Sequence, residues 1–293
     1  MSAEGGTPIM LVCIWATGPA LDAATHLGVS VFEGRNGTLP GIFITAGMDL
    51  RISNLPIPLD GSAPPPVTAS VRMDTWHHWL FVACDQVRVA SDHEADLHQA
   101  LAEERATGSE DSPRKQAALE GEFRGAMITV ASCAFAVDAF YATVKERFGS
   151  HPDAERWKDN GIPRHGQIAA TLHYRLKLKG RAMPVIRDLL KQLFKFRDMA
   201  VHPHALFSDP IYRADLNAGV EPRFVTYSAE HARKSLGLTV ELMTVLMDMA
   251  EKVAEGENAQ WATFAKERIN AVRGAARAIQ GVEFPDREET DTR

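Results

Sequence analysis

Residues 184–202, PVIRDLLKQLFKFRDMAVH, form the stretch on which the interpretation of this chain depends. Placed on a period of 3.6 residues, its apolar side chains fall on one face, which predicts an amphipathic helix packed against a core. The residues of this face are Ile186, Leu189, Leu190, Leu193, Phe194, Ala200 and Val201. Pro184 suits a first helical turn, and Pro203 disfavours helical geometry at the residue before it. The helix is therefore expected to end near His202.

Three polar residues lie at the C-terminal end of this predicted helix. Arg197 falls within the apolar face, so its charge is expected to point inward. His202 is expected at the helix C-terminus, where the negative end of the macrodipole favours a cationic side chain. Arg197 and His202 thus combine a permanent cation with a group that can exchange a proton, and Asp198 lies beside the cation.

The overall composition describes an acidic chain with one basic segment. The chain has 293 residues and a formal net charge of −6, which gives no general signal for nucleic acid or membrane binding. Residues 164–197 differ, because they hold nine lysines and arginines and a single acid, Asp188. The nine are Arg164, Arg175, Lys177, Lys179, Arg181, Arg187, Lys191, Lys195 and Arg197. Such a segment indicates a site for a polyanion or, alternatively, a solvated helix face.

Cysteine usage and hydropathy predict a cytoplasmic protein. Cys13, Cys84 and Cys133 are far apart and lie in apolar runs, as expected of reduced, buried thiols. The first ten residues lack the basic region of a signal peptide. No apolar stretch approaches the roughly 20 residues that a membrane span needs, so no membrane partner is expected.

Residues 1–66 are predicted to form a small β-rich cap. Short β-branched segments recur at 9–16, 27–33, 41–45 and 48–59, separated by Gly, Pro and Asn. Asn36-Gly37 is a hairpin signal because it accepts the positive φ of tight turns. Pro64-Pro65-Pro66 then predicts an extended linker.

From residue 68 onward the pattern is helical, and we divide this part into a bundle at 67–256, an additional helix at 257–280 and a disordered tail at 281–293. The predicted helices begin near residue 68, at Ser112-Pro113, at Ile168, at Pro184, after Ser228 and at Ala259. The third is expected to end at Gly180, and residues 203–226 to form a long surface connection.

Asp138 lies in the middle of the apolar face of the long helix predicted at 114–148. An isolated buried carboxylate is costly, so Asp138 needs a donor. We take Arg197 as its structural partner, because the two charges of opposite sign face a shared core. A helix N-terminus or a hydroxyl is the alternative donor.

Several common sites are absent from the sequence. It contains no Gly-rich phosphate loop, no Cys-x-x-Cys, no His-Glu-x-x-His and no nucleophile-elbow motif. His202-Pro203-His204 lacks the further ligands that would complete a metal site. No metal and no other cofactor are therefore expected.

The hexapeptide 197–202, RDMAVH, resembles the signature of the HEPN (higher eukaryotes and prokaryotes nucleotide-binding) family. That signature is an Arg, four to six residues, then a His, often with a polar residue after the Arg, a position that Asp198 matches. The segment 125–148, GAMITVASCAFAVDAFYATVKERF, resembles the earlier core helix of the family. The resemblance covers about residues 70–255. It implies a mainly α fold, with a HEPN-like antiparallel helical bundle following the β-rich N-terminal region.

The resemblance also implies a function, a metal-independent endoribonuclease with a toxin or phage-defence role. In this interpretation Arg197 holds the phosphate, His202 transfers a proton and Asp198 orients one of them. RNA contacts would come from Arg175, Lys177, Lys179, Lys191 and Lys195. The implied partners are RNA, a second copy of the chain and an antitoxin.

The alternative is a non-catalytic RNA-binding or nucleotide-binding module, or a protein-interaction module. An arginine paired with Asp138 and a histidine that caps carbonyls would explain the same residues without catalysis.

Overall fold

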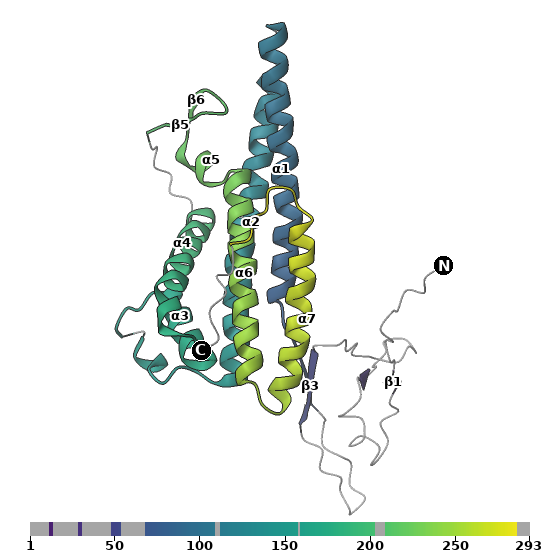
Figure 1. Cartoon of the computed structure of the whole chain (residues 1–293), viewed down its shortest axis with the longest axis vertical. Coiled ribbons are helices and arrows are strands. Elements are labelled where there is room, and N and C mark those ends of the chain that lie inside the picture. The colour runs from purple at the N-terminus through teal and green to yellow at the C-terminus, as the bar shows by residue number, and fades with distance from the viewer. Residues whose placement is uncertain are drawn as a thin grey trace, which may run out of the picture. The chain divides into compact units, whose positions relative to one another are not determined.

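The computed structural model describes residues 12–13, 29–30, 48–53, 68–108, 112–157, 159–202 and 209–285. The chain divides into two compact units, residues 1–74 and 75–293. The first unit contains short strands, and the second, which runs from the blue of α1 to yellow in Figure 1, is helical.

The described part of the N-terminal unit consists of two strand pairs. β1 (Val12–Cys13) pairs in parallel with β2 (Val29–Ser30). β3 (Met48–Ser53) pairs antiparallel with β4 (Thr68–Met73) over its full length. The prediction that helix begins near 68 is therefore wrong, because residues 68–73 complete a β ladder. The predicted strand at 41–45, the hairpin at 36–37 and the linker at 64–66 lie outside the described residues.

The second unit is built almost entirely of helices. Its elements are α1 (Trp76–Thr107), α2 (Ser112–Phe148), η3 (Ala154–Trp157), α3 (Arg164–Leu176), η4 (Gly180–Ala182), α4 (Met183–Val201), β5 (Ile211–Arg213), β6 (Ala218–Val220), α5 (Pro222–Thr226), α6 (Ala229–Val253) and α7 (Glu257–Arg277). The predicted mainly α class is thus confirmed.

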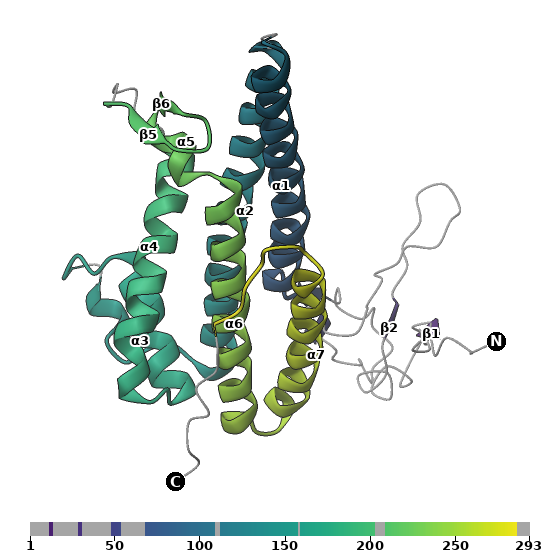
Figure 2. The same cartoon turned by 45° about the horizontal axis from the view of Figure 1, so that its top comes forward.

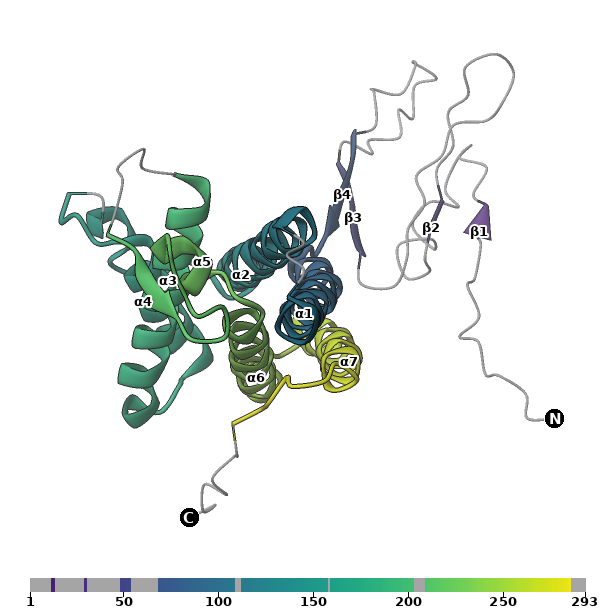
Figure 3. The same cartoon turned by 90° about the horizontal axis from the view of Figure 1, so that it is seen from above.

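Four long helices form the centre of this unit. α1 packs against α2, α6 and α7, and α2 packs against α6. Figure 3 shows the four helices end-on as one group, with α3 and α4 on the side of α2 and α6. α3 and α4 contact each other and α2, so the six helices share one hydrophobic core. The predicted separate helix at 257–280 is therefore an integral member of the core, in which Trp261, Ile269 and Val272 are buried.

The α1–α2 contact depends on a glycine. A Cβ atom added at Gly125 would lie 2.9 Å from both the Ala90 backbone nitrogen and the Gln86 carbonyl oxygen. Any larger residue would force the two helices apart. Figure 2 shows these helices side by side along their length.

α2 is the one helix among the described residues that is long and apolar enough to span a membrane. Of its most apolar 18-residue window, 56% is buried inside the protein. Its apolar character is thus that of a helix at the centre of a core.

The ends of the helices agree in part with the predictions. α4 ends at Val201, and Ser228 caps α6, with the His231 backbone N–H donating to Ser228 Oγ at 3.3 Å. α3 ends earlier than predicted, at Leu176, because the next residue, Lys177, adopts a left-handed φ of 51° and stops the helix before Gly180.

Residues 281–285 belong to the tail predicted to be disordered at 281–293, and for them that prediction is wrong. Val282 and Phe284 pack against the core. The Glu283 carbonyl lies so close to α6 that a Cβ atom at Gly237 would be 2.1 Å from it. Phe284 also lies beneath the guanidinium groups of Arg273 and Arg277. Residues 286–293 lie outside the described part of the chain.

Candidate functional site at the end of helix α4

His202 lies directly after α4. Its backbone N–H donates to the Asp198 carbonyl at 2.9 Å, and its side chain is exposed. The end of the helix is held from the side by Tyr227, whose hydroxyl donates to the Phe196 carbonyl at 2.7 Å. The exposed imidazole is thus carried by an anchored helix end.

Arg197 is held by its own helix. Its Nε and Nη2 donate to Asp198 Oδ1 at 3.0 and 2.6 Å, and its guanidinium lies 4.5 Å from the centre of the Phe194 ring. The side chain is 18% exposed, so the expected inward position is partly met. Asp198 itself is exposed. The ion pair therefore lies at the surface, within reach of a ligand.

The predicted pairing of Asp138 with Arg197 is wrong. Asp138 Oδ1 accepts from Arg164, with Nε at 2.9 Å and Nη2 at 2.5 Å, and the same guanidinium lies 4.5 Å from the centre of the Tyr141 ring. Arg164 is the first residue of α3, which packs against α2 and brings a cation over the carboxylate. The donor is thus neither a helix N-terminus nor a hydroxyl.

The five predicted RNA contacts do not converge. Lys177 and Lys179 are exposed in the connection before α4, and at 1.5 Å per residue that helix places them about 28 Å or more from its other end. Lys191 and Lys195 are exposed on α4, roughly 16 and 10 Å along the axis from His202. Of the five, these two are the ones near the histidine.

The fifth predicted contact, Arg175, already has partners. Its Nε donates to the Ser150 carbonyl at 3.1 Å, and its guanidinium lies 4.9 Å from the centre of the Tyr174 ring. It thus holds the loop after α2 against α3.

His165, the second residue of α3, was not among the predicted site residues. Burial lowers the pKa of His165, and the positive charges of Lys191 and Arg187 lower it further, whereas Asp198 opposes them. A second imidazole thus interacts electrostatically with charged side chains of α4. The sequence shows that His165 lies in the basic segment, but it does not show that this histidine interacts with charged residues of α4.

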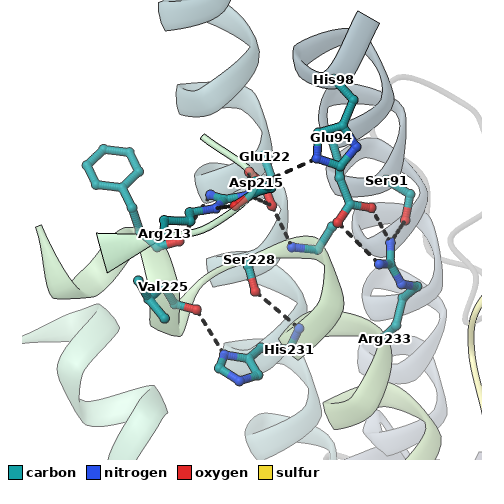
Figure 4. A network of polar contacts seen from close by, with 12 residues as sticks. Ser91, Glu94, His98, Glu122, Arg213, Asp215, Val225, Ser228, His231 and Arg233 are labelled. Atoms are coloured by element: carbon teal, nitrogen blue, oxygen red, sulfur yellow. Dashed lines mark hydrogen bonds and ion pairs between the residues drawn. The ribbon is translucent and has the colours of Figure 1, made fainter. Parts of the chain in front are cut away.

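The described part of the surface connection predicted at 203–226, residues 209–226, takes part in a buried ion pair that was also missed. Glu122 of α2 is fully buried and accepts from Arg213 Nη2 at 2.9 and 2.8 Å. The backbone N–H of Ala229, at the start of α6, donates to the same carboxylate at 2.9 Å. Figure 4 shows these groups converging between α2, β5 and α6. The connection is therefore fixed to the core.

Other groups extend this contact. Arg213 Nε donates to Asp215 Oδ1 at 3.1 Å, and Asp215 Oδ2 lies 3.3 Å from His98 Nε2 on α1. Burial raises the pKa of Glu122, although Ala229 and Arg213 oppose it. Partial burial of Asp215 would raise its pKa, but the hydrogen bond to Arg213 and its positive charge outweigh burial, and the pKa of Asp215 is lowered.

Among the described residues, no group of three or more His, Cys, Asp or Glu side chains could hold a metal ion. His204 lies outside those residues.

No family model, no curated protein and no solved structure matches this chain.

Proposed function

We propose that this protein is a cytoplasmic, metal-independent endoribonuclease of the HEPN type. The observation that carries the proposal is the exposed imidazole of His202 at the end of α4, with the guanidinium of Arg197 on the preceding turns. The two positions are five apart in the sequence, which corresponds to about 7.5 Å along a helix axis. The antiparallel packing of long helices is compatible with a HEPN-like bundle.

The proposed reaction uses the RNA's own 2′-hydroxyl. Its oxygen attacks the adjacent phosphorus, the bond from phosphorus to the 5′-oxygen breaks, and a proton leaves the first oxygen while another reaches the second. His202 carries out a proton transfer, and Arg197 stabilises the charge on the phosphoryl oxygens. Asp198 occupies the Nε and Nη2 side of the Arg197 guanidinium, so the phosphate would meet its Nη1 side.

A homodimer supports this chemistry better than a single chain. Two proton transfers are needed, and a second copy of the α4 end would bring a second His202 and a second Arg197 to the same phosphate. The local positive charge would also double, which would attract RNA to an acidic protein. By resemblance, the proposal extends to a toxin or phage-defence role with an antitoxin partner.

A non-catalytic RNA-binding, nucleotide-binding or protein-interaction module is the second candidate. The ion pair between Arg197 and Asp198 favours it, because that carboxylate already takes the Nε and Nη2 donors and leaves only the Nη1 side of the guanidinium for a phosphate. In this case the exposed lysines of α4 would bind without chemistry.

The deciding experiment compares wild type with His202→Ala on mixed RNA in excess EDTA. We expect the wild type to cleave RNA and the variant to lose cleavage, with a thermal midpoint within about 1–2 °C of wild type because the side chain is exposed. His173→Ala, which removes an exposed histidine from α3, is the matched control and should retain activity. Cleavage that strictly requires added metal would exclude the mechanism, and binding without cleavage would favour the second candidate.

A further inference from the structure

The β5–β6 hairpin exposes a tyrosine in a fixed position. Tyr212 is 64% exposed, although its hydroxyl donates to Asn217 Oδ1 at 2.8 Å. That hydrogen bond joins β5 to the last residue of the turn before β6 and restrains the ring. The next residue, Arg213, is buried and bound to Glu122, so the strand that carries the tyrosine is anchored to the core.

The cross-strand partner of Tyr212 leaves the ring uncovered. In the antiparallel register Tyr212 stands opposite Gly219, which has no side chain to pack on the ring. Directly opposite residues normally provide the side-chain contact that covers an aromatic ring in a sheet. A restrained ring with an open face can accept another flat group at little cost in conformational entropy.

The hairpin lies next to the end of α4. α5 follows β6 directly and contacts β5, and Tyr227, the residue after α5, binds the Phe196 carbonyl of α4. Figures 1 and 2 both show the β5–β6 hairpin beyond the C-terminal end of α4, the end that carries His202. The exposed ring is therefore on the side of the molecule where the proposed site lies.

We propose that Tyr212 is a stacking platform for an unpaired base of single-stranded RNA bound at the end of α4. This inference rests on the proposed function and specifies its substrate. Bases of single-stranded nucleic acids stack on exposed aromatic rings, and lysines follow the backbone phosphates. Lys191 and Lys195 supply the cations along α4.

A protein partner fits this surface less well. Among the residues that the structure describes, the large exposed apolar side chains near the end of α4 are Val201, Ile211 and Tyr212. Three side chains cover much less than the roughly 800 Å² per partner that stable protein interfaces bury. A single base needs only one ring face.

The test measures RNA binding in a His202→Ala background, which keeps the RNA intact. The probes are an unstructured 12-nucleotide RNA with a fluorescent end label, the same length of RNA lacking all bases, and a 12-base-pair RNA duplex. The protein variants are Tyr212→Ala, Tyr212→Leu and Tyr212→Phe, each in the full chain. Tyr212→Phe is the matched control, since it keeps the ring and removes only the hydrogen bond to Asn217.

We expect Tyr212→Ala and Tyr212→Leu to weaken binding of the single strand by about 5-fold to 150-fold, the range for one stacked base. Tyr212→Phe should bind within about 3-fold of the parent, because a phenyl ring stacks as well. None of the three substitutions should change the affinity for RNA without bases or for the duplex.

Four results would overturn the inference. Equal losses on RNA with and without bases would show that the ring does not stack. Unchanged binding by Tyr212→Ala would exclude the platform while leaving the proposed function intact. If the parent binds no RNA, the proposed function fails together with the inference. A change in sedimentation of Tyr212→Ala, with RNA binding unaffected, would assign the ring to a protein contact.

Discussion

Removal of the Arg213 side chain should destabilise the protein severely, although this residue lies in a connection between helices. In Arg213→Met the carboxylate of Glu122 would remain fully buried, with the Ala229 N–H as its remaining hydrogen-bond donor. Leaving one member of a buried ion pair without its partner costs about 3–5 kcal/mol. Loss of an exposed ion pair would reduce the free energy of unfolding by about 1 kcal/mol or less.

The loss should depend on pH, and the sign follows from the pKa of Glu122. Burial raises this pKa above the ordinary glutamate value of 4.5 in the native protein, so the native state binds the proton more readily than the unfolded chain. The contribution of Glu122 to stability therefore falls as pH rises between 4.5 and the native pKa. Without Arg213 the native pKa rises further, so the variant should lose more stability at pH 8 than at pH 5.

Urea unfolding followed by circular dichroism at these two pH values measures the effect. The double variant Glu122→Leu/Arg213→Met is the control, because replacing a whole buried pair with apolar residues is often close to neutral. We expect it to recover most of the loss. A cost below about 1 kcal/mol at pH 8 for Arg213→Met, or a double variant as unstable as the single one, would refute the reasoning.

Two further predictions concern other parts of the bundle. Burial lowers the pKa of His77 to about 4, with His78 and Arg268 contributing. The unfolded chain takes up this proton first, so stability should fall by about 3 kcal/mol from pH 7 to pH 4, and His77→Gln should reduce that dependence in the same unfolding assay. Gly237→Ala should cost about 1–3 kcal/mol and speed proteolysis near Glu283, because its methyl group would displace the carbonyl there. Gly274→Ala is the control and should change neither stability nor proteolysis, because a Cβ atom there meets nothing within 4 Å. Equal sensitivity of both variants to protease would contradict this account.

The period of apolar residues was enough to place the main helices. α4 and α2 agree with their predicted ranges to within about two residues, and Ser228 was correctly assigned as a cap. Helical periodicity and capping are local properties, so a single sequence contains them. The helical start predicted near 68 failed because β4 depends on β3, a strand about 20 residues earlier in the chain.

The exposed histidine at the end of α4 could likewise be placed from the sequence. The groups that surround this site could not be predicted from the sequence. Asp138 pairs with a residue 26 positions away, and Glu122 with one 91 positions away. Such partners are chosen by the way α3 and β5 pack against α2, and many positions in the sequence carry an arginine.

The sequence by itself therefore determined that the chain is mainly helical and where Arg197, Asp198 and His202 stand on their helix. The tertiary structure decided which charges are neutralised, which lysines lie near the histidine and that Tyr212 stays exposed beside the same helix end. The physical reason is the distance along the sequence over which the deciding interactions act. Turns and helices depend on neighbours within about four residues, whereas ion pairs and exposed surfaces depend on how distant segments pack.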